Sequence, residues 1–197
     1  MTLLVLGLIV FLGTHAFSMA RKPRAELIGR IGEGAFKGLY SLLAIGGLVM
    51  IAIGFGRYRA EGYIPVWDPP VWTRHLALLL VWFAFVALPA AYLPGRIKRV
   101  LKHPMLVAVK AWALAHLLAN GDLGSILLFG SFLVWAVLAR ISAKHRDVAA
   151  EHGAPRGSAH ETRNDILAVA IGTAVYLAFV FWLHPLLIGV PVLPGRA

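Results

Sequence analysis

Six long apolar segments, separated by polar loops, constrain this chain more than any other feature of its sequence. They cover roughly residues 3–19, 36–55, 76–93, 104–119, 123–138 and 166–183. Hydrophobic residues make up 59% of the 197 residues and charged residues only 14%, so a soluble domain would have too little interior to bury the apolar side chains. The sequence therefore predicts one all-α integral membrane domain over residues 1–197, with about six transmembrane helices surrounded by the lipid bilayer.

The distribution of basic residues predicts the orientation of these helices. The first, third and fifth loops contain fourteen Lys and Arg residues, whereas the second and fourth loops and the C-terminal tail contain four. Because loops rich in Lys and Arg stay in the cytoplasm, we expect both termini on the outer side, which requires an even number of crossings. The formal net charge of +10 comes from these loops, so nucleic acid is not an expected partner. The chain has no cysteine, which excludes disulfides, thiolate metal centres and covalently attached c-type haem.

The lengths of the segments and the residues at their ends predict local structure. The first, fourth and fifth segments are short for a hydrocarbon core of ~30 Å, so we expect local thinning of the bilayer or a partly re-entrant path there. Pro104 suits the first turn of a helix, and Asn120-Gly121-Asp122 suits its end, so the fourth and fifth segments form an antiparallel hairpin. Residues 26–37 are predicted to be a loop or a short interfacial helix, and residues 140–163 are the one long polar stretch.

Histidine is the side chain within the apolar segments that could carry chemistry. No Asp or Glu lies inside any segment, which argues against a proton-coupled carrier. His15 lies in the first segment and His116 in the fourth, offset by roughly 10 Å in depth at about 1.5 Å per residue. Two neutral imidazoles on different helices could ligate the iron of one flat macrocycle, and Trp112 and Asn120 share the helix face of His116. The alternative is that both histidines only form hydrogen bonds between helices.

The histidine motifs resemble the NnrU family of bacterial membrane proteins. His103-Pro104 is followed, thirteen residues after His103, by the histidine of Ala115-His116-Leu117-Leu118, and then by Ala119-Asn120-Gly121-Asp122. Gly13-Thr14-His15 and Leu183-His184-Pro185 match the family's other histidine positions. The resemblance covers essentially the whole chain, and it implies a multi-pass protein of the bacterial inner membrane with periplasmic termini. The plant zeta-carotene isomerase, a haem b membrane enzyme, resembles the same domain.

The resemblance implies a cofactor and a general role. Non-covalent haem b is expected, with His15 and His116 as its iron ligands. The role would be redox-linked or isomerase-like and associated with denitrification, with nitric oxide or a hydrophobic small molecule as the ligand or substrate. Judged by position alone, His103 before Pro104 is instead typical of a helix start. The side chains expected at the cofactor are His15, His116, Trp112, Asn120, His103 and His184.

Two other classes of function stay open at this point. A haem-free accessory or assembly factor for denitrification would have the same apolar segments without a cofactor. Lys102-His103-Pro104 at a helix start also resembles the isoprenylcysteine and phospholipid methyltransferases, which use S-adenosylmethionine. Those families usually carry paired carboxylates after the next helix, whereas residues 140–146 of this chain are basic. A methyltransferase is therefore the less favoured alternative.

Overall fold

The computed structural model describes residues 1–147 and 159–193. Across these residues the chain is helical, and the only β-type pairing is an isolated bridge between Pro65 and Asp122. The helices are α1 (Thr2–Met19), α2 (Arg21–Ile31), α3 (Glu33–Ala60), α4 (Val71–Ala90), α5 (Arg96–Leu101), α6 (Pro104–Ala119), α7 (Leu123–Asp147), α8 (Ala159–Ala178), the π-helical turn η1 (Phe179–Leu183) and α9 (His184–Ile188).

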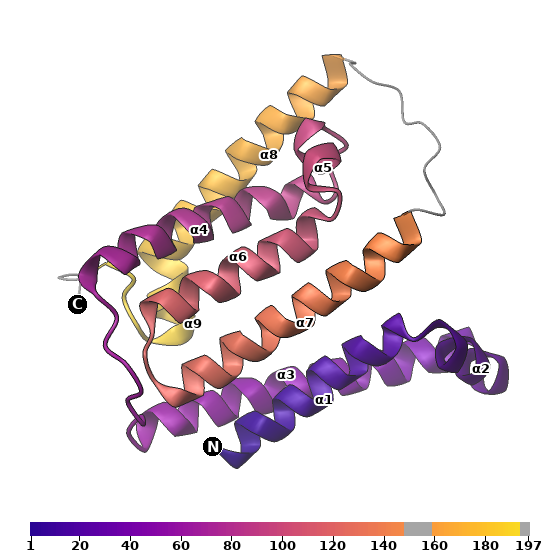
Figure 1. Ribbon diagram of the computed structural model, residues 1–197, viewed down its shortest axis with the longest axis horizontal. Coiled ribbons are helices and arrows are strands. Elements are labelled where there is room, and N and C mark those ends of the chain that lie inside the picture. The colour runs from indigo at the N-terminus through magenta and orange to yellow at the C-terminus, as the bar shows by residue number, and fades with distance from the viewer. Residues whose placement is uncertain (148–158, 194–197) are drawn as a thin grey trace.

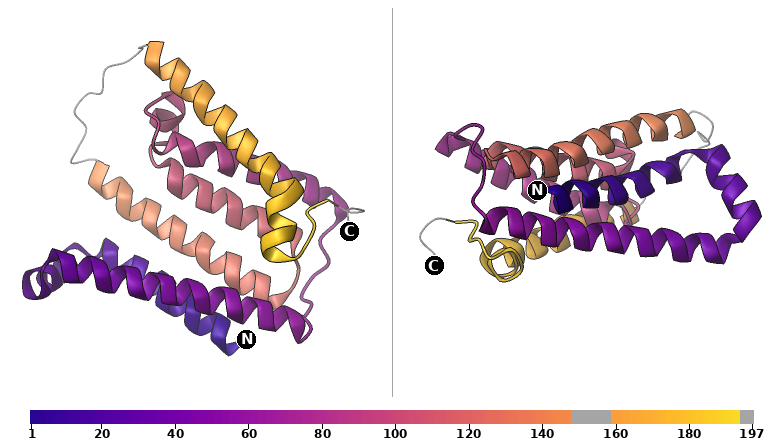
Figure 2. Two further views of the ribbon diagram at one scale, coloured as in Figure 1. Left: turned by 180° about the vertical axis from the view of Figure 1, so that it is seen from behind. Right: turned by 90° about the horizontal axis from the view of Figure 1, so that it is seen from below.

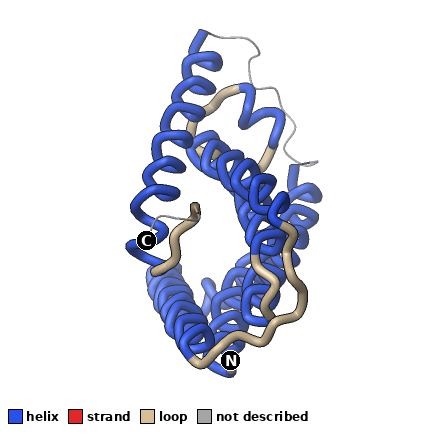
Figure 3. The backbone as a smooth tube through the Cα atoms, turned by 90° about the vertical axis from the view of Figure 1, so that its left-hand side faces the viewer, coloured by secondary structure: helices blue, strands red, loops and turns tan. Residues whose placement is uncertain are grey.

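The long helices pack side by side in an order that differs from their order in the sequence. Each packs against the next in the series α3, α1, α7, α6, α4, α8 (Figures 1 and 2). Viewed along the helices, the series follows a curve rather than a flat layer (Figure 3). Arg59 near the end of α3 donates a hydrogen bond of 3.2 Å from Nη1 to the Ile188 carbonyl of α9, which joins the two ends of the series.

Glycines on α3 allow α1 to approach closely. A Cβ atom at Gly47 would lie 2.7 Å from the backbone nitrogen of Phe11, and one at Gly54 would overlap the backbone of Leu4. Small residues at such contacts let membrane helices pack backbone to backbone, where van der Waals contact replaces the missing hydrophobic driving force.

The helices have the length and the surface expected of a membrane protein. Five segments are long and apolar enough to cross a bilayer: Thr2–Met19, Glu33–Ala60, Val71–Ala90, Leu123–Lys144 and His160–Ile188. The sixth apolar helix, α6, has 16 residues and is shorter. Large apolar side chains are exposed along them, for example Leu42 on α3 at 69%. The predicted all-α membrane class is confirmed, while six complete crossings and outward-facing termini stay predictions of the charge pattern.

Helix α7 is longer than the hydropathy of its segment indicates. α7 continues to Asp147 instead of ending near residue 138, because the Ala, Arg and Lys residues that follow are good helix formers although they are less apolar. The prediction that the fifth segment is short is therefore wrong, and its length does not require a thinned bilayer or a re-entrant path. A short helix does precede the second segment, but with other bounds than the predicted 26–37: α2 ends at Ile31, Gly32 separates it from α3, and residues 33–37 form the start of α3. Residues 148–158 of the polar stretch lie outside the described residues.

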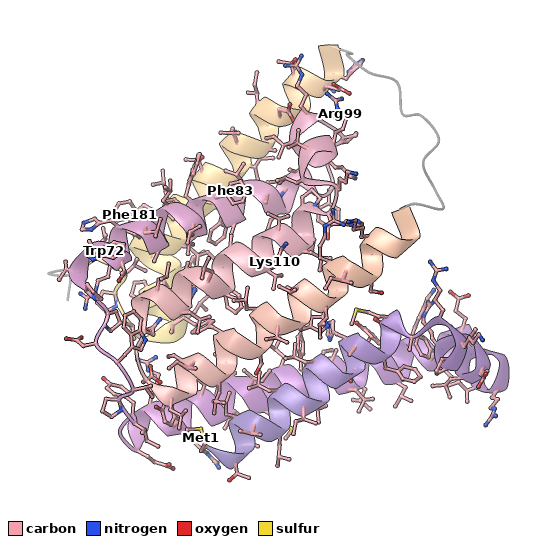
Figure 4. The ribbon with its side chains drawn as sticks, in the orientation of Figure 1. Met1, Trp72, Phe83, Arg99, Lys110 and Phe181 are labelled. Atoms are coloured by element: carbon pink, nitrogen blue, oxygen red, sulfur yellow. The ribbon has the colours of Figure 1, made fainter. Side chains whose placement is uncertain are left out.

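Polar contacts at one end of the helix series hold the short basic helix α5 against α8. The Asp165 carboxylate on α8 accepts hydrogen bonds of 3.1 Å from the backbone N–H groups of Arg96 and Ile97, the first residues of α5. Arg99 on α5 forms an ion pair of 2.6 Å with Glu161 on α8, and Figure 4 shows Arg99 beside the start of that helix. Asp165 therefore acts as the N-terminal cap that α5 lacks in its own sequence.

Candidate functional site

The Asn120-Gly121-Asp122 motif forms the tight turn between α6 and α7. The Asn120 amide donates a hydrogen bond of 2.8 Å to the carbonyl of His116, so it satisfies one of the last carbonyls of α6. The Asp122 carboxylate accepts a hydrogen bond of 2.9 Å from the backbone N–H of Ser125, which caps the start of α7. The predicted antiparallel hairpin is confirmed, and His116 lies one turn before its tip.

The same turn is fastened to the loop between α3 and α4, which the sequence did not indicate. The Gly121 carbonyl accepts hydrogen bonds from the backbone N–H groups of Val66 (2.8 Å) and Trp67 (3.1 Å). A Cβ atom at Gly121 would overlap the carbonyl oxygen of Trp67. In the sequence, this close approach is indicated only by the position of Gly121 between two capping residues. The turn therefore fixes the end of α6, and with it the height of His116.

His116 lies among aromatic rings from α6 and α7. Its imidazole is half-buried and stacks on Phe129 with ring centroids 4.4 Å apart and planes at 26°. The Trp112 ring lies 5.2 Å away, which confirms that residues four apart on α6 share a face. The Nδ1 atom lies 2.8 Å from the Trp112 carbonyl oxygen. A carbonyl can only accept, so Nδ1 carries the proton and the lone pair of this neutral imidazole lies on Nε2.

His15 and His184 hold their protons in the same way. His15 Nδ1 donates to the Phe11 carbonyl at 2.7 Å, and His184 Nδ1 donates to the Val190 carbonyl at 2.7 Å. The second contact exists because the chain turns back at Gly189, which has φ of +76° and ends α9. All three imidazoles therefore present Nε2 as the electron-pair donor. A backbone acceptor on Nδ1 is the arrangement that orients histidine for binding a metal through Nε2.

The π-helical turn η1 comes directly before His184. A proline has no N–H, and its ring clashes with the carbonyl four residues earlier in a regular helix. Pro185 follows His184, and the wider turn over Phe179–Leu183 precedes it. Such single π-turns inside helices are frequent at functional sites. The local structure around His184 thus follows from His184-Pro185 and from Gly189 beyond it.

The structure brings His116 and His184 near each other and places His15 elsewhere. The two imidazoles lie within electrostatic range of each other, so a positive charge on one would be felt by the other. His15 instead contacts Tyr40 (5.5 Å) and Trp135 (5.7 Å). Trp135 and the His116 partner Phe129 are six residues apart on α7, which corresponds to about 9 Å along the helix. This offset agrees with the depth difference expected from the sequence, but α7 also lies between the helices that carry His15 and His116.

A run of aromatic rings fills the space between His15 and His116. Phe11 lies 4.2 Å from His15 and 5.6 Å from Phe132, whose ring is 5.5 Å from Trp112. Trp112 in turn contacts His116. The two predicted iron ligands are thus connected by packed side chains and their rings are not in direct contact.

Comparison with models of protein families identifies the family of this chain. A family model described as NnrU protein matches residues 3–192. The chain belongs to the NnrU family. Neither a search of curated proteins nor a search of solved structures gave a match. Family membership thus confirms the resemblance carried by the histidine motifs, and the match spans all the histidines considered above.

The remaining predicted site residues of this NnrU-family chain lie apart from His116 or serve as caps. His103 is at the N-terminal boundary of α6, thirteen residues and therefore about 20 Å along the helix from His116. The Asn120 amide caps α6. Among the residues that the structure describes, no three His, Asp or Glu side chains gather into a metal-binding group.

Proposed function

We propose that this NnrU-family membrane protein binds haem b non-covalently, with His116 as an axial ligand of the iron. The observation that supports the proposal is the hydrogen bond from His116 Nδ1 to the Trp112 carbonyl, which leaves Nε2 as the donor atom. A neutral imidazole in this form is a strong iron ligand. The Trp112 and Phe129 rings beside it offer an apolar surface of the kind that a flat macrocycle packs against.

The second axial position has two candidates. The sequence favours His15, which has the same protonated Nδ1 but lies beyond the rings of Phe132 and Trp112. The Nδ1 atom of His184 is likewise hydrogen-bonded to a backbone carbonyl, and its ring lies within electrostatic range of His116. We therefore place His184 ahead of His15 as the partner of His116, and an experiment can separate the two.

The proposed role is redox-linked. Bound haem would supply one-electron chemistry, and it would offer a site for a small diatomic ligand such as nitric oxide only after one axial imidazole is released. The chain's contribution is to hold each imidazole in one protonation state and orientation through its backbone carbonyl, and to exclude water with the aromatic rings around His116. From family membership we also propose a role in denitrification or an isomerase-like reaction on a hydrophobic substrate.

Absorbance spectroscopy of the detergent-purified protein, expressed with ample haem, tests the proposal. A Soret band is expected for the wild type and for His75→Ala, a control in which an exposed histidine of α4 is removed. His116→Ala is expected to lose the haem. His184→Ala is expected to retain haem but to change from a six-coordinate to a five-coordinate spectrum, because the second imidazole is gone.

Each outcome has a definite interpretation. If His15→Ala rather than His184→Ala changes the coordination, the pairing predicted from the sequence is correct and our ordering of the two is wrong. A folded but colourless wild type refutes haem binding and favours the haem-free accessory protein. A Soret band that His116→Ala leaves unchanged refutes the central assignment, whatever the other variants show.

A further inference from the structure

Two adjoining cavities lie between α1, α2 and α3, away from His116 and His184. The first has a volume of about 360 Å³ and is lined mostly by polar and basic side chains: Ser18, Arg24, Phe36, Lys37, Tyr40 and Ser41. The second has a volume of about 250 Å³ and is lined mostly by small and apolar residues. Phe36 and Tyr40 line both cavities, so the two lie side by side.

The polar cavity has the chemistry of a site for phosphate. The Arg24 guanidinium lies 5.5 Å above the centroid of the Phe36 ring, and Phe36 is buried. Lys37 enters from α3 and pairs with Glu33 at 2.8 Å, but both side chains of this pair are largely exposed, so the pair is weak. Five of the residues from 21 to 37 are Lys or Arg and two are Glu. The local excess of positive charge therefore favours an anion.

The apolar cavity extends from the polar one toward the middle of the helices. Phe17 and Phe36 line it at the level of the polar cavity. Its innermost lining residues, Gly13 on α1 and Leu43 on α3, lie about 7.5 Å and about 9 Å deeper along their helices than Ser18 and Lys37. Leu43 is 42% exposed and its neighbour in the lining, Leu39, is 45% exposed. These leucines present apolar surface to a space that a hydrocarbon chain would fill.

We propose that these cavities bind one anionic phospholipid, with its phosphate between Arg24 and Lys37 and an acyl chain along Gly13, Leu39 and Leu43. The direction from polar to apolar lining matches the direction from headgroup to chain in a leaflet at the basic ends of α1 and α3. The lipid would fasten the exposed helix α2, which has no buried residue, to the rest of the protein. Tyr40 also contacts His15 at 5.5 Å, so the lipid would lie beside that histidine. This proposal does not depend on haem.

Native mass spectrometry of the detergent-purified protein with added phosphatidylglycerol or phosphatidylcholine tests the headgroup contacts. The wild type is expected to retain phosphatidylglycerol in preference to phosphatidylcholine. Arg24→Gln and Lys37→Gln are each expected to reduce that preference by about fivefold, the value of one basic residue at an anionic membrane surface. Arg30→Gln is the matched control, because Arg30 is a basic residue of α2 outside both linings. An equal reduction in all three variants would overturn the proposal, since it would indicate general attraction to the basic surface.

A second pair of variants tests the acyl chain. A Cβ atom at Gly13 or at Gly46 meets no atom within 4 Å, so a side chain can begin at either position without a clash, and circular dichroism checks that Gly13→Leu and Gly46→Leu are folded. Only Gly13 lines the apolar cavity, so only Gly13→Leu is expected to lose bound phosphatidylglycerol. Retention equal to that of Gly46→Leu would overturn the proposal. Inorganic phosphate is the competitor that distinguishes a free anion from a lipid: displacement of the lipid by phosphate alone would show that the acyl chain contributes nothing and would also overturn it.

Discussion

Replacing Gly121 by alanine should destabilise the protein, because its Cβ atom would overlap the Trp67 carbonyl oxygen. Gly121 is not among the glycines with positive φ, so its backbone conformation suits alanine and the cost comes from contact alone. To relieve the overlap, the α6–α7 turn and the α3–α4 loop must separate. Separation breaks the hydrogen bonds from Val66 and Trp67 to the Gly121 carbonyl. Each such bond contributes about 0.5–1.5 kcal/mol, so the expected loss is about 1–3 kcal/mol in the free energy of unfolding.

Unfolding by sodium dodecyl sulfate in mixed micelles, followed by circular dichroism, measures this loss. Gly130→Ala is the matched control, since a Cβ atom at Gly130 in α7 meets no atom within 4 Å. That control should be as stable as the wild type or more stable by up to about 1 kcal/mol, because alanine favours a helix over glycine. If Gly121→Ala is as stable as Gly130→Ala, the turn is not held by the loop, and the argument that it fixes the height of His116 fails.

Three further predictions concern other parts of the chain. A reporter that is active only in the periplasm should give signal when fused to the C-terminus, and one inserted at 96–102 should be silent; the reverse pattern would refute the orientation deduced from charge. Asp165→Ala should lower the free energy of unfolding by about 0.5–2 kcal/mol, because α5 loses its cap; no change in the micelle titration would show that the cap is replaced by water. Phe132→Ala should lower the free energy of unfolding by about 1–3 kcal/mol in the same titration, since the ring contacts both Phe11 and Trp112. A smaller loss than that caused by Phe181→Ala would contradict the importance of the central rings.

The sequence predicted those features that depend on neighbouring residues. Pro104 and Asn120 mark the two ends of α6 as the structure has them, because each acts on its own turn of helix. The spacing of four between Trp112 and His116 likewise predicted their contact. The end of α7 was missed because hydropathy decreases at Arg140 while helix propensity does not.

The relation between the histidines could not be predicted, because it depends on which helices become neighbours. Their positions in the sequence give depth, and the expected offset between His15 and His116 agrees with their partners on α7. Depth does not reveal that α7 packs between α1 and α6. The orientation of the His184 ring depends on the return of the chain at Gly189, which brings the Val190 carbonyl, beyond the last apolar segment, to Nδ1. The sequence therefore favoured His15, inside a helix, over His184, at the end of one, as the partner of His116.

The aromatic residues of α7 explain how two separated histidines belong to one packed unit. Phe129, Phe132 and Trp135 follow one another at intervals of three, and each interval turns a helix by about 60° short of a full revolution. The three rings consequently wind around α7 from the side of α6 to the side of α1. Phe129 stacks on His116, Phe132 bridges Trp112 and Phe11, and Trp135 contacts His15. The positions of the two histidines therefore depend on the same run of rings.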